Sequence, residues 1–292
     1  MASWHPVELA AVLAHWPSGL GEARPVPVSG LSGAWVWRVG QGFALRAMPL
    51  TQASVEVVRQ RHQWMQLARA AGLTFVPQVL ALSSGDSVLA RGGWLWELQQ
   101  WMPGQPDLDQ PPRAARVAQA CRALARLHRV WQPLSRPSST APALERRLAE
   151  WPDSQLQSWR RRSWKLHPCL VDIHRDHVLF EDDQVSGMID YGTLQWDIPH
   201  ADLARLLGSL AEDDEALWQV GLQAYAQLLP LPEVALIRRL DRVGTWIALR
   251  RWQRWLAQRT EVSPRAQARW QQLQRRVARW TEPTWPIQPE QP

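Results

Sequence analysis

The chain has almost no lysine and almost no cysteine. Lys165 is the only lysine among 33 basic residues, so a reaction that needs a particular lysine must use this one or do without. The two cysteines, Cys121 and Cys169, are too few for a disulfide framework or a thiolate metal site. This shortage fits a reducing compartment, and we expect a cytoplasmic protein.

Long apolar runs are missing as well. No segment approaches the roughly 20 apolar residues of a membrane-spanning helix, and the N-terminal stretch MASWHPVELAAVLAHW has no basic leader and contains Glu8. The sequence therefore predicts neither a secretory signal nor a transmembrane segment. With 292 residues, 46% of them hydrophobic, the chain is long enough for one large domain or two smaller ones.

Positive charge is abundant, but it identifies no partner. The formal charge of +6 permits attraction to many anions. The stretch WIALRRWQRWL at 246–256 would suit a nucleic-acid or membrane surface, a wall for an anionic substrate, or a solvated arginine face over a packed bundle. We favour the solvated face, because one helix is not a continuous basic patch. No nucleic-acid partner is therefore expected.

The first third of the chain is typical of a small sheet with an inserted helix. Helices are expected within 1–22 and at 54–71, the second one ending at Gly72. Strands are expected at 34–40, 42–48, 77–82, 87–90 and 94–101.

The remainder is mainly helical after a proline-rich linker at 103–112. One short β insertion interrupts it at 169–192, with the sequence CLVDIHRDHVLFEDDQVSGMIDYG. We therefore predict an α+β chain with a sheet-rich N-terminal lobe at 1–101 and a larger helical C-terminal lobe at 102–292.

Ionisable side chains are concentrated in this β insertion. His177 follows Asp172 by five residues, and Asp190 follows His177 by thirteen. A loop after a strand and a returning hairpin can bring three such groups to one point, as a catalytic carboxylate beside a two-ligand cation site would require. A structural ion network is the alternative interpretation.

The insertion resembles the catalytic stretch of the aminoglycoside phosphotransferase and choline kinase family, which reads HGDLHPGNVLF followed by IDFG. Asp172, His174, VLF at 178–180 and IDYG at 189–192 match it in identity and spacing. The stretches GLTFVP at 72–77 and ALARLH at 123–128 extend the resemblance. It implies a two-lobed, protein-kinase-like fold with a small antiparallel sheet and one helix in the N-lobe.

The resemblance also implies an activity: transfer of the terminal phosphoryl group of ATP, or another nucleoside triphosphate, to a hydroxyl of a small molecule. Asp172 would act as the base, and His177 and Asp190 would hold a divalent cation, Mg²⁺ or Mn²⁺. His174 would either position the loop or contact the substrate.

Contacts to the nucleotide are implied in the N-lobe. Backbone N–H groups of Ser32 and Gly33 would face the phosphates, and Arg46 would replace the family's phosphate-binding lysine. The backbone of Gln100 and Met102 would face the adenine. A partner for Arg46 cannot be assigned, since His62 stands near the place of the usual glutamate and Glu56 lies more than a turn earlier.

Two departures from the family pattern leave alternatives open. His177 replaces an asparagine, and because a histidine nitrogen suits manganese better than magnesium, we predict a changed metal preference. With Arg46 and His177 both altered, a degenerate pseudokinase that binds nucleotide without transfer is an alternative. A metal hydrolase that uses His174, His177 and Asp190 is a third. The acceptor, the choice between ATP and GTP and the oligomeric state have no signal in the sequence.

Overall fold

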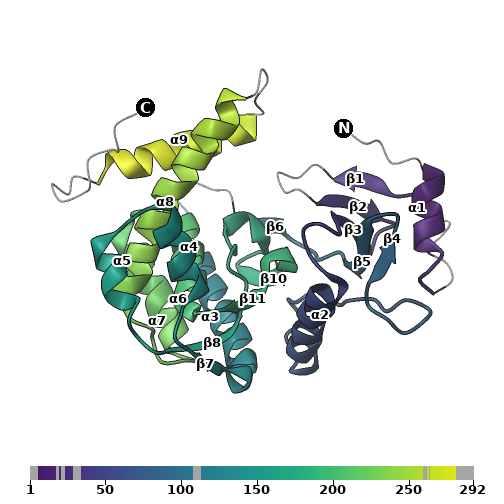
Figure 1. Cartoon of the computed structure of the whole chain (residues 1–292), viewed down its shortest axis with the longest axis horizontal. Helices are drawn as coiled ribbons and strands as arrows, with labels where there is room; N and C mark the ends of the chain where they lie inside the picture. Colours follow the sequence, from purple (N-terminus) through teal and green to yellow (C-terminus); the bar gives the residue numbers. More distant parts are fainter. Residues whose placement is uncertain are drawn as a thin grey trace.

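The computed structural model describes residues 6–17, 20, 24–28, 34–107, 113–258, 262 and 264–280. Figure 1 shows two lobes side by side, the N-lobe in purple and blue and the C-lobe in teal, green and yellow. The N-lobe contains an antiparallel sheet and the C-lobe is mainly helical, which confirms the predicted two-lobed α+β fold. The boundary between residues 101 and 102 stays a prediction.

Apart from a short first strand that the sequence did not predict and the missing strand at 77–82, the N-lobe elements follow the expected order. They are α1 (Pro6–Leu13), β1 (Val26–Val28), β2 (Trp35–Val39), β3 (Phe43–Pro49), α2 (Val55–Ala70), β4 (Leu89–Arg91) and β5 (Trp94–Gln100).

The C-lobe elements begin after the connecting segment. They are β6 (Gln105–Pro106), α3 (Ala114–Trp131), η1 (Gln132–Leu134), β7 (Arg136–Ser138), α4 (Pro142–Glu150), α5 (Ser154–Trp159), β8 (Trp164–Cys169), η2 (Arg175–His177), β9 (Val178–Glu181), β10 (Gln184–Met188), η3 (Tyr191–Thr193), β11 (Gln195–Asp197), α6 (Pro199–Leu210), α7 (Glu215–Ala226), α8 (Val234–Ala257) and α9 (Pro264–Ala278).

The N-lobe sheet has the strand order β1-β2-β3-β5-β4, with antiparallel neighbours. Strands β3 and β5 pair along their full length, and this register places Arg46 directly opposite Glu97. The strand expected at 77–82 is wrong, because this segment forms only an isolated bridge between Val79 and Gln99. Pro77 starts the segment without an N–H group to donate to a ladder.

Helix α2 crosses beside the sheet and carries side chains toward the cleft. Ser54 caps its N-terminus by accepting a hydrogen bond from the N–H of Val57 at 3.4 Å. The chain leaves the helix through Gly72, whose φ of +82° is readily adopted only by glycine. The buried face of α2 includes His62, and it therefore delivers an imidazole to the N-lobe interior.

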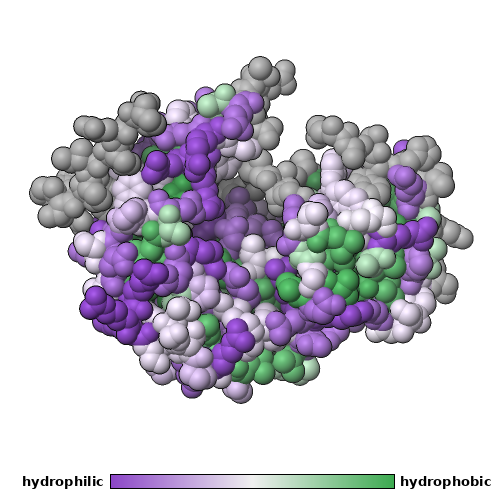
Figure 2. All heavy atoms as spheres, viewed as in Figure 1, coloured by the Kyte–Doolittle hydropathy of each residue, from purple (hydrophilic) through white to green (hydrophobic). Residues whose placement is uncertain are grey.

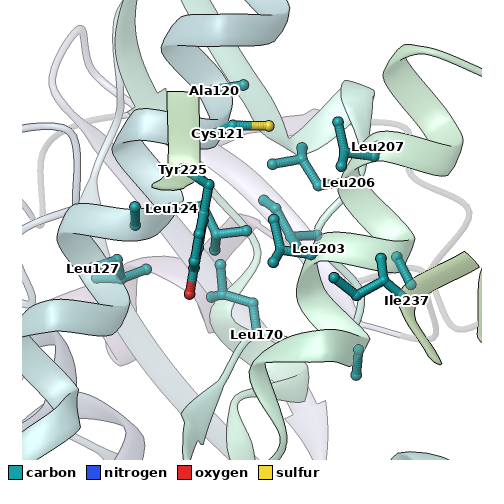
Figure 3. Close-up of a cluster of buried hydrophobic side chains, with 14 of the residues drawn as sticks. Ala120, Cys121, Leu124, Leu127, Leu170, Leu203, Leu206, Leu207, Tyr225 and Ile237 are labelled. Atoms are coloured by element: carbon teal, nitrogen blue, oxygen red, sulfur yellow. The ribbon is translucent and has the colours of Figure 1, made fainter. Parts of the chain in front are cut away.

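The C-lobe core forms where α3, α6, α7 and α8 meet. Figure 3 shows leucines of α3 and α6 packed around the ring of Tyr225, with Leu170 of the catalytic loop among them. Both cysteines are free and buried, and burial raises the pKa of the Cys121 thiol to about 12. This core is a rigid support directly beneath the loop that follows β8.

Two small sheets position the β insertion on that core. Their strand orders are β10-β9-β6 and β11-β8-β7. The first closes the hairpin between His177 and Asp190, and the second holds the strand that precedes Asp172. Among the described residues, no helix has the length and apolarity needed to cross a membrane.

Candidate active site

The site lies between the lobes, where the β insertion of the C-lobe faces the N-lobe sheet. In the view of Figure 2 the surface is hollowed between the two lobes, and the hollow is lined largely by hydrophilic residues. Hydrophobic residues are gathered instead on the neighbouring face of the N-lobe. A recess with hydrophilic walls suits a charged ligand.

The loop that follows β8 and leads to Asp172 is held in place by the buried carboxylate of Asp202. Asp202 of α6 accepts hydrogen bonds from the N–H groups of Leu170 at 2.8 Å and Val171 at 2.6 Å. Its Oδ2 also lies 3.0 Å from Nε2 of His128. Val171 has a φ of +67°, a conformation that costs a β-branched residue about 1–3 kcal/mol. Asp202 therefore keeps the loop in a strained shape that exposes the residue that follows.

Asp172 is that residue, and its carboxylate is accessible. Its side chain is 48% exposed, and its Oδ1 accepts a hydrogen bond from Nε of Arg205 at 2.8 Å. Arg205 belongs to α6, so the same helix supports the loop and neutralises its exposed carboxylate. A half-exposed, ionised carboxylate can accept a proton from a substrate hydroxyl.

His177 has one ring nitrogen committed to the backbone. Its Nδ1 lies 3.0 Å from the carbonyl oxygen of Asp172. Because a carbonyl only accepts, Nδ1 must carry the proton, and the lone pair of the imidazole is on Nε2. Metal-binding histidines are commonly oriented in this way by a backbone carbonyl. Nε2 lies 3.7 Å from Oδ2 of Asp190, so the two atoms can share a cation.

Asp190 is presented by an unusual backbone turn. Its φ of +61° places it in the left-handed region, and its Oδ1 accepts a hydrogen bond from the N–H of Gly192 at 3.3 Å. The same oxygen lies 3.2 Å from Nη2 of Arg46. A β-carbon on Gly192 would lie 2.1 Å from that guanidinium nitrogen. The glycine of the IDYG motif therefore gives Arg46 access to Asp190.

The structure supplies the partner of Arg46 that the sequence left unassigned. Nη1 of Arg46 lies 3.0 Å from Oε1 of Glu97, on β5 rather than on the helix. The other oxygen of Glu97 lies 2.7 Å from Nε2 of His62, whose Nδ1 is 2.9 Å from the hydroxyl of Ser87. Burial opposes ionisation of Glu97, but the hydrogen bond from His62 and the charge of Arg46 hold its pKa at about 2.

A second guanidinium stands on the same side of the cleft. Nε of Arg61 on α2 donates to the carbonyl of Leu194 at 3.0 Å, which links the N-lobe helix to the segment after Asp190. Burial, partly offset by the carboxylates of Glu97 and Asp190, lowers the pKa of Arg61. Arg46 and Arg61 together make this side of the cleft suited to phosphate oxygens.

Four further residues, Ser32, Gly33, Gln100 and Met102, were predicted to contact the nucleotide. Ser32 and Gly33 lie outside the described residues. The N–H of Gln100 donates to the carbonyl of Gln78 at 2.7 Å, so an adenine contact at this residue would have to use its carbonyl group. Met102 is 5% exposed, and a β-carbon on Gly187 would lie 2.7 Å from that of Met102.

His174 lies beside His177 and has a local backbone contact. The two ring centroids are 3.8 Å apart. Nδ1 of His174 accepts a hydrogen bond from the N–H of Asp176 at 3.4 Å, at the start of η2. Of the two predicted roles, this geometry favours positioning the loop.

Comparisons with known proteins agree with this geometry. A family model described as the phosphotransferase enzyme family matches residues 22–237. No curated protein matches the sequence.

Several solved structures are similar over nearly their whole length. An amicoumacin kinase in complex with AMP-PNP and Ca²⁺ has a TM-score of 0.66 at 12% identity, covering 93% of this chain and 91% of its own. A spectinomycin phosphotransferase in complex with ADP has a TM-score of 0.64 at 12% identity, covering 96% of each chain. An aminoglycoside phosphotransferase from Alicyclobacillus acidocaldarius has a TM-score of 0.62 at 16% identity, covering 95% of this chain and 93% of its own. These likenesses establish the fold.

Proposed function

Because the chain belongs to the phosphotransferase enzyme family, we propose that it transfers the terminal phosphoryl group of ATP to a hydroxyl of a small molecule. The observation that carries this proposal is the meeting of His177 and Asp190 beside the loop of Asp172. Nε2 of His177 lies 3.7 Å from Asp190, and its Nδ1 lies 3.0 Å from the backbone of Asp172. The solved kinases that the chain resembles include complexes with AMP-PNP and with ADP.

In the proposed reaction the hydroxyl oxygen of the acceptor attacks the terminal phosphorus of ATP. The bond between that phosphorus and the bridging oxygen breaks, and ADP leaves with the electron pair. Asp172 takes the hydroxyl proton, for which its half-exposed carboxylate is accessible. The products are the phosphorylated acceptor and ADP.

His177 and Asp190 would hold the divalent cation. When bound, such a cation would neutralise the charge of the phosphate groups. The donor set of one imidazole nitrogen and one carboxylate fits manganese better than magnesium, and the tautomer of His177 leaves the required lone pair on Nε2.

Arg46 would bind the phosphate oxygens of the nucleotide. It now bridges Glu97 and Asp190. Arg46 holds Oδ1 of Asp190 and Oδ2 faces His177, so a cation would use Oδ2, and Arg46 would turn from Oδ1 toward the phosphates. Glu97 stays as its buried anchor, so the guanidinium keeps one fixed point during this exchange.

A pseudokinase is the second candidate. Both Asp172 and Asp190 form ion pairs with arginines, Arg205 and Arg46 respectively. If these pairs persisted with nucleotide bound, each arginine would keep the charge of its carboxylate neutralised, and the protein would bind nucleotide without transfer.

The state of the two cysteines agrees with the location that the cysteine content predicts. Cys121 and Cys169 are both free and buried, as expected of thiols that stay reduced in the cytoplasm. We propose a cytoplasmic enzyme on this ground.

Thermal unfolding with ATP and manganese, followed by turnover with a panel of hydroxyl compounds, tests the proposal. We expect ATP with manganese to raise the melting temperature, and ADP release to depend on a hydroxyl acceptor. Stabilisation without acceptor-dependent ADP release would favour the pseudokinase. If nucleotide did not raise the melting temperature and the protein showed metal-dependent hydrolytic activity, the metal hydrolase would be favoured.

A further inference from the structure

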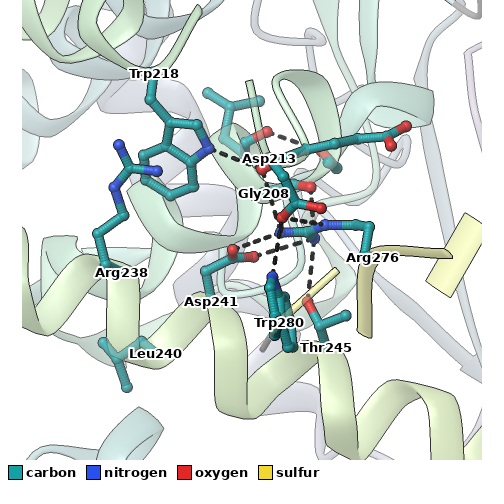
Figure 4. A network of polar contacts seen from close by, with 12 residues as sticks. Gly208, Asp213, Trp218, Arg238, Leu240, Asp241, Thr245, Arg276 and Trp280 are labelled. Carbon is teal, nitrogen blue, oxygen red and sulfur yellow. Dashed lines mark hydrogen bonds and ion pairs between the residues drawn. The ribbon is translucent and has the colours of Figure 1, made fainter. Parts of the chain in front are cut away.

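Helix α9 is joined to the C-lobe by the buried Arg276 and by Gln272, which donates a hydrogen bond to the carboxylate of Glu212. Figure 4 shows the guanidinium of Arg276 among Asp241 and Thr245 of α8 and Gly208 of α6. It lies 2.7 Å from Oδ2 of Asp241, 3.1 Å from the hydroxyl of Thr245 and 2.8 Å from the carbonyl oxygen of Gly208. Charge-assisted contacts of this kind to three acceptors hold a helix in a defined position.

The position of Arg276 determines what the preceding turns of α9 face. Arg269 is seven residues earlier, which is two helical turns, so both side chains lie on the same face of α9. On α6, Arg205 precedes Gly208 by three residues and shares its face. Gly208 contacts Arg276, so Arg205 and Arg269 lie one and two turns from the point where the two helices meet, and the charge of Arg205 acts on Arg269.

Arg269 has little negative charge to balance it. Among the described residues its hydrogen-bond partner is the amide oxygen of Gln272, and no carboxylate forms an ion pair with it. Burial first, and then the charge of Arg205, lower its pKa to about 10, although Asp176 and Glu212 act in the opposite direction. Arg205 and Arg269 thus act on each other, and Arg205 is paired with the proposed base.

A third arginine is likewise partly buried and, among the described residues, forms no ion pair with a carboxylate. Arg147 of α4 donates to the carbonyl oxygens of Leu240 at 2.9 Å and Ala143 at 3.1 Å, and no carboxylate of the described residues pairs with it. Burial is the largest cause that lowers its pKa to about 10, and the charge of Arg205 acts in the same direction.

The two carboxylates whose charges act on Arg147 are already paired with other arginines. Asp197 pairs with Arg146, and Asp241 pairs with Arg276. Placing several cations near one another without a paired anion is unfavourable, and an anionic ligand would remove that cost.

We propose that Arg205 and Arg269 form an acceptor subsite for an anionic group, so that the substrate is a hydroxyl compound carrying a carboxylate or a phosphate. This inference rests on the proposed function. The anion would lie against the two guanidinium groups, with the reacting hydroxyl near the Asp172 carboxylate. Arg205, which pairs with Asp172 when no substrate is present, would exchange that contact for the substrate anion. A cationic amino alcohol would be repelled at the same place.

The interpretation that Arg205 serves only to neutralise Asp172 leaves Arg269 unexplained. One arginine is enough to balance one half-exposed carboxylate. The second arginine adds a charge with which no carboxylate of the described residues forms an ion pair, although Asp176 and Glu212 act on it. A pair of such guanidinium groups can recognise a carboxylate or phosphate from outside.

The experiment compares acceptors that differ only in charge. Glycerate, glycerol phosphate, glycerol and 3-amino-1,2-propanediol are offered with ATP and manganese, and ADP release is measured. In parallel, malonate and inorganic phosphate are titrated both against protein saturated with AMP-PNP and manganese and against nucleotide-free protein, and the melting temperature is recorded. The second measurement reports on the subsite even when none of the four alcohols has the right shape for turnover.

We expect an anionic alcohol to be preferred, and malonate or phosphate to raise the melting temperature. Arg269→Gln should abolish that rise and increase the KM for the anionic acceptor by about 10- to 100-fold, the effect of one lost charge-assisted hydrogen bond, with little change in kcat. Arg269→Lys, which keeps the charge, should restore part of both. Whether malonate or phosphate gives the larger rise identifies the class of anion.

Arg122→Gln is the matched control. Arg122 also has a glutamine amide as its partner, with Nε 3.1 Å from Oε1 of Gln227, but it lies on α3 and is not part of the subsite. It should respond to anions as the wild type does. Equal anion responses of Arg269→Gln and wild type, or a preference for the amino alcohol, would overturn the inference. Failure of ATP with manganese to bind would instead overturn the proposed function, because the anion response is read independently.

Discussion

The two sides of the cleft handle positive charge in opposite ways. On the N-lobe side, Arg46 is saturated by two carboxylates, Glu97 at 3.0 Å and Asp190 at 3.2 Å. On the C-lobe side, Arg205 has a single carboxylate, and Arg269 has no ion pair within the described part of the chain. The first side compensates its arginine internally, and the second leaves charge for a ligand.

This difference concerns two separate proposals: how Arg46 is anchored on the nucleotide side, and which charge the acceptor carries. An arginine in place of the usual lysine needed a new anchor, and Glu97 with His62 supplies it from within the N-lobe. No such compensation accompanies Arg269. Under the proposed function, Glu97 anchors the arginine that would bind the phosphates, and Arg205 with Arg269 would bind the anion of the acceptor.

Asp172→Asn is expected to have the largest effect. The amide cannot take the hydroxyl proton, so kcat should fall by about a hundred- to ten-thousandfold, the usual contribution of a positioned base. The pair with Arg205 is half exposed on the Asp172 side, so unfolding free energy should change by less than about 1 kcal/mol. ADP-release kinetics and thermal unfolding measure the two quantities. Retention of full kcat would remove Asp172 as the base.

Glu97→Gln tests the internal anchor on the N-lobe side. It removes the charge that balances a buried arginine and should lower the unfolding free energy by about 3 kcal/mol. Glu215→Gln is the control, since its pair with Arg238 involves a carboxylate that is 67% exposed, and it should cost less than about 1 kcal/mol.

The same anchor predicts a pH dependence. The pKa of Glu97 is about 2 in the folded chain, against an ordinary value of 4.5. Its contribution to stability is therefore complete above pH 4.5 and is lost as the pH falls from 4.5 toward 2. Denaturation measured across that range should show a smaller slope for Glu97→Gln than for wild type, and equal slopes would contradict the assignment.

His177→Asn is expected to change metal preference by roughly tenfold. The substitution replaces a nitrogen ligand with the family's amide oxygen, which favours magnesium. The ratio of kcat/KM with manganese to that with magnesium should therefore fall. A wild-type enzyme that works equally well or better with magnesium would refute the predicted preference before any variant is made.

Arg46→Lys should have the smallest effect. Lysine keeps the positive charge but cannot bridge two carboxylates with a planar fork. We expect a loss of about 1 kcal/mol in unfolding free energy and a KM for ATP within about tenfold of wild type. Arg46→Met, which removes the charge, should raise the KM much further. Similar KM values for the two variants would show that Arg46 does not contact phosphates.

Much of the architecture could be predicted because it depends on local patterns. Alternating apolar residues around Gly40 indicated the β2–β3 hairpin, and helical spacing indicated α2 and α3. The segment at 77–82 was mistaken for a strand, because an extended, apolar stretch has the same pattern whether or not a neighbour pairs with it. Pairing is a property of the sheet, and only one bridge forms there.

The candidate site divides in the same way. Asp172, His177 and Asp190 were identified because they occur within one short insertion with recognisable spacing. Glu97 was missed because it stands 51 residues from Arg46, and the register of β3 on β5 cannot be deduced from either strand alone. Arg205 and Arg269 gave no signal at all, since arginines are frequent throughout this chain.

By itself, the sequence determined the two-lobed fold and the groups that gather at the end of β8, because both follow from short-range patterns of polarity and spacing. Tertiary structure decided which carboxylate anchors Arg46 and which arginines stand beside Asp172. The physical reason is that a charge acts over a few ångströms in space, and here those few ångströms join residues from helices and strands that are far apart along the chain.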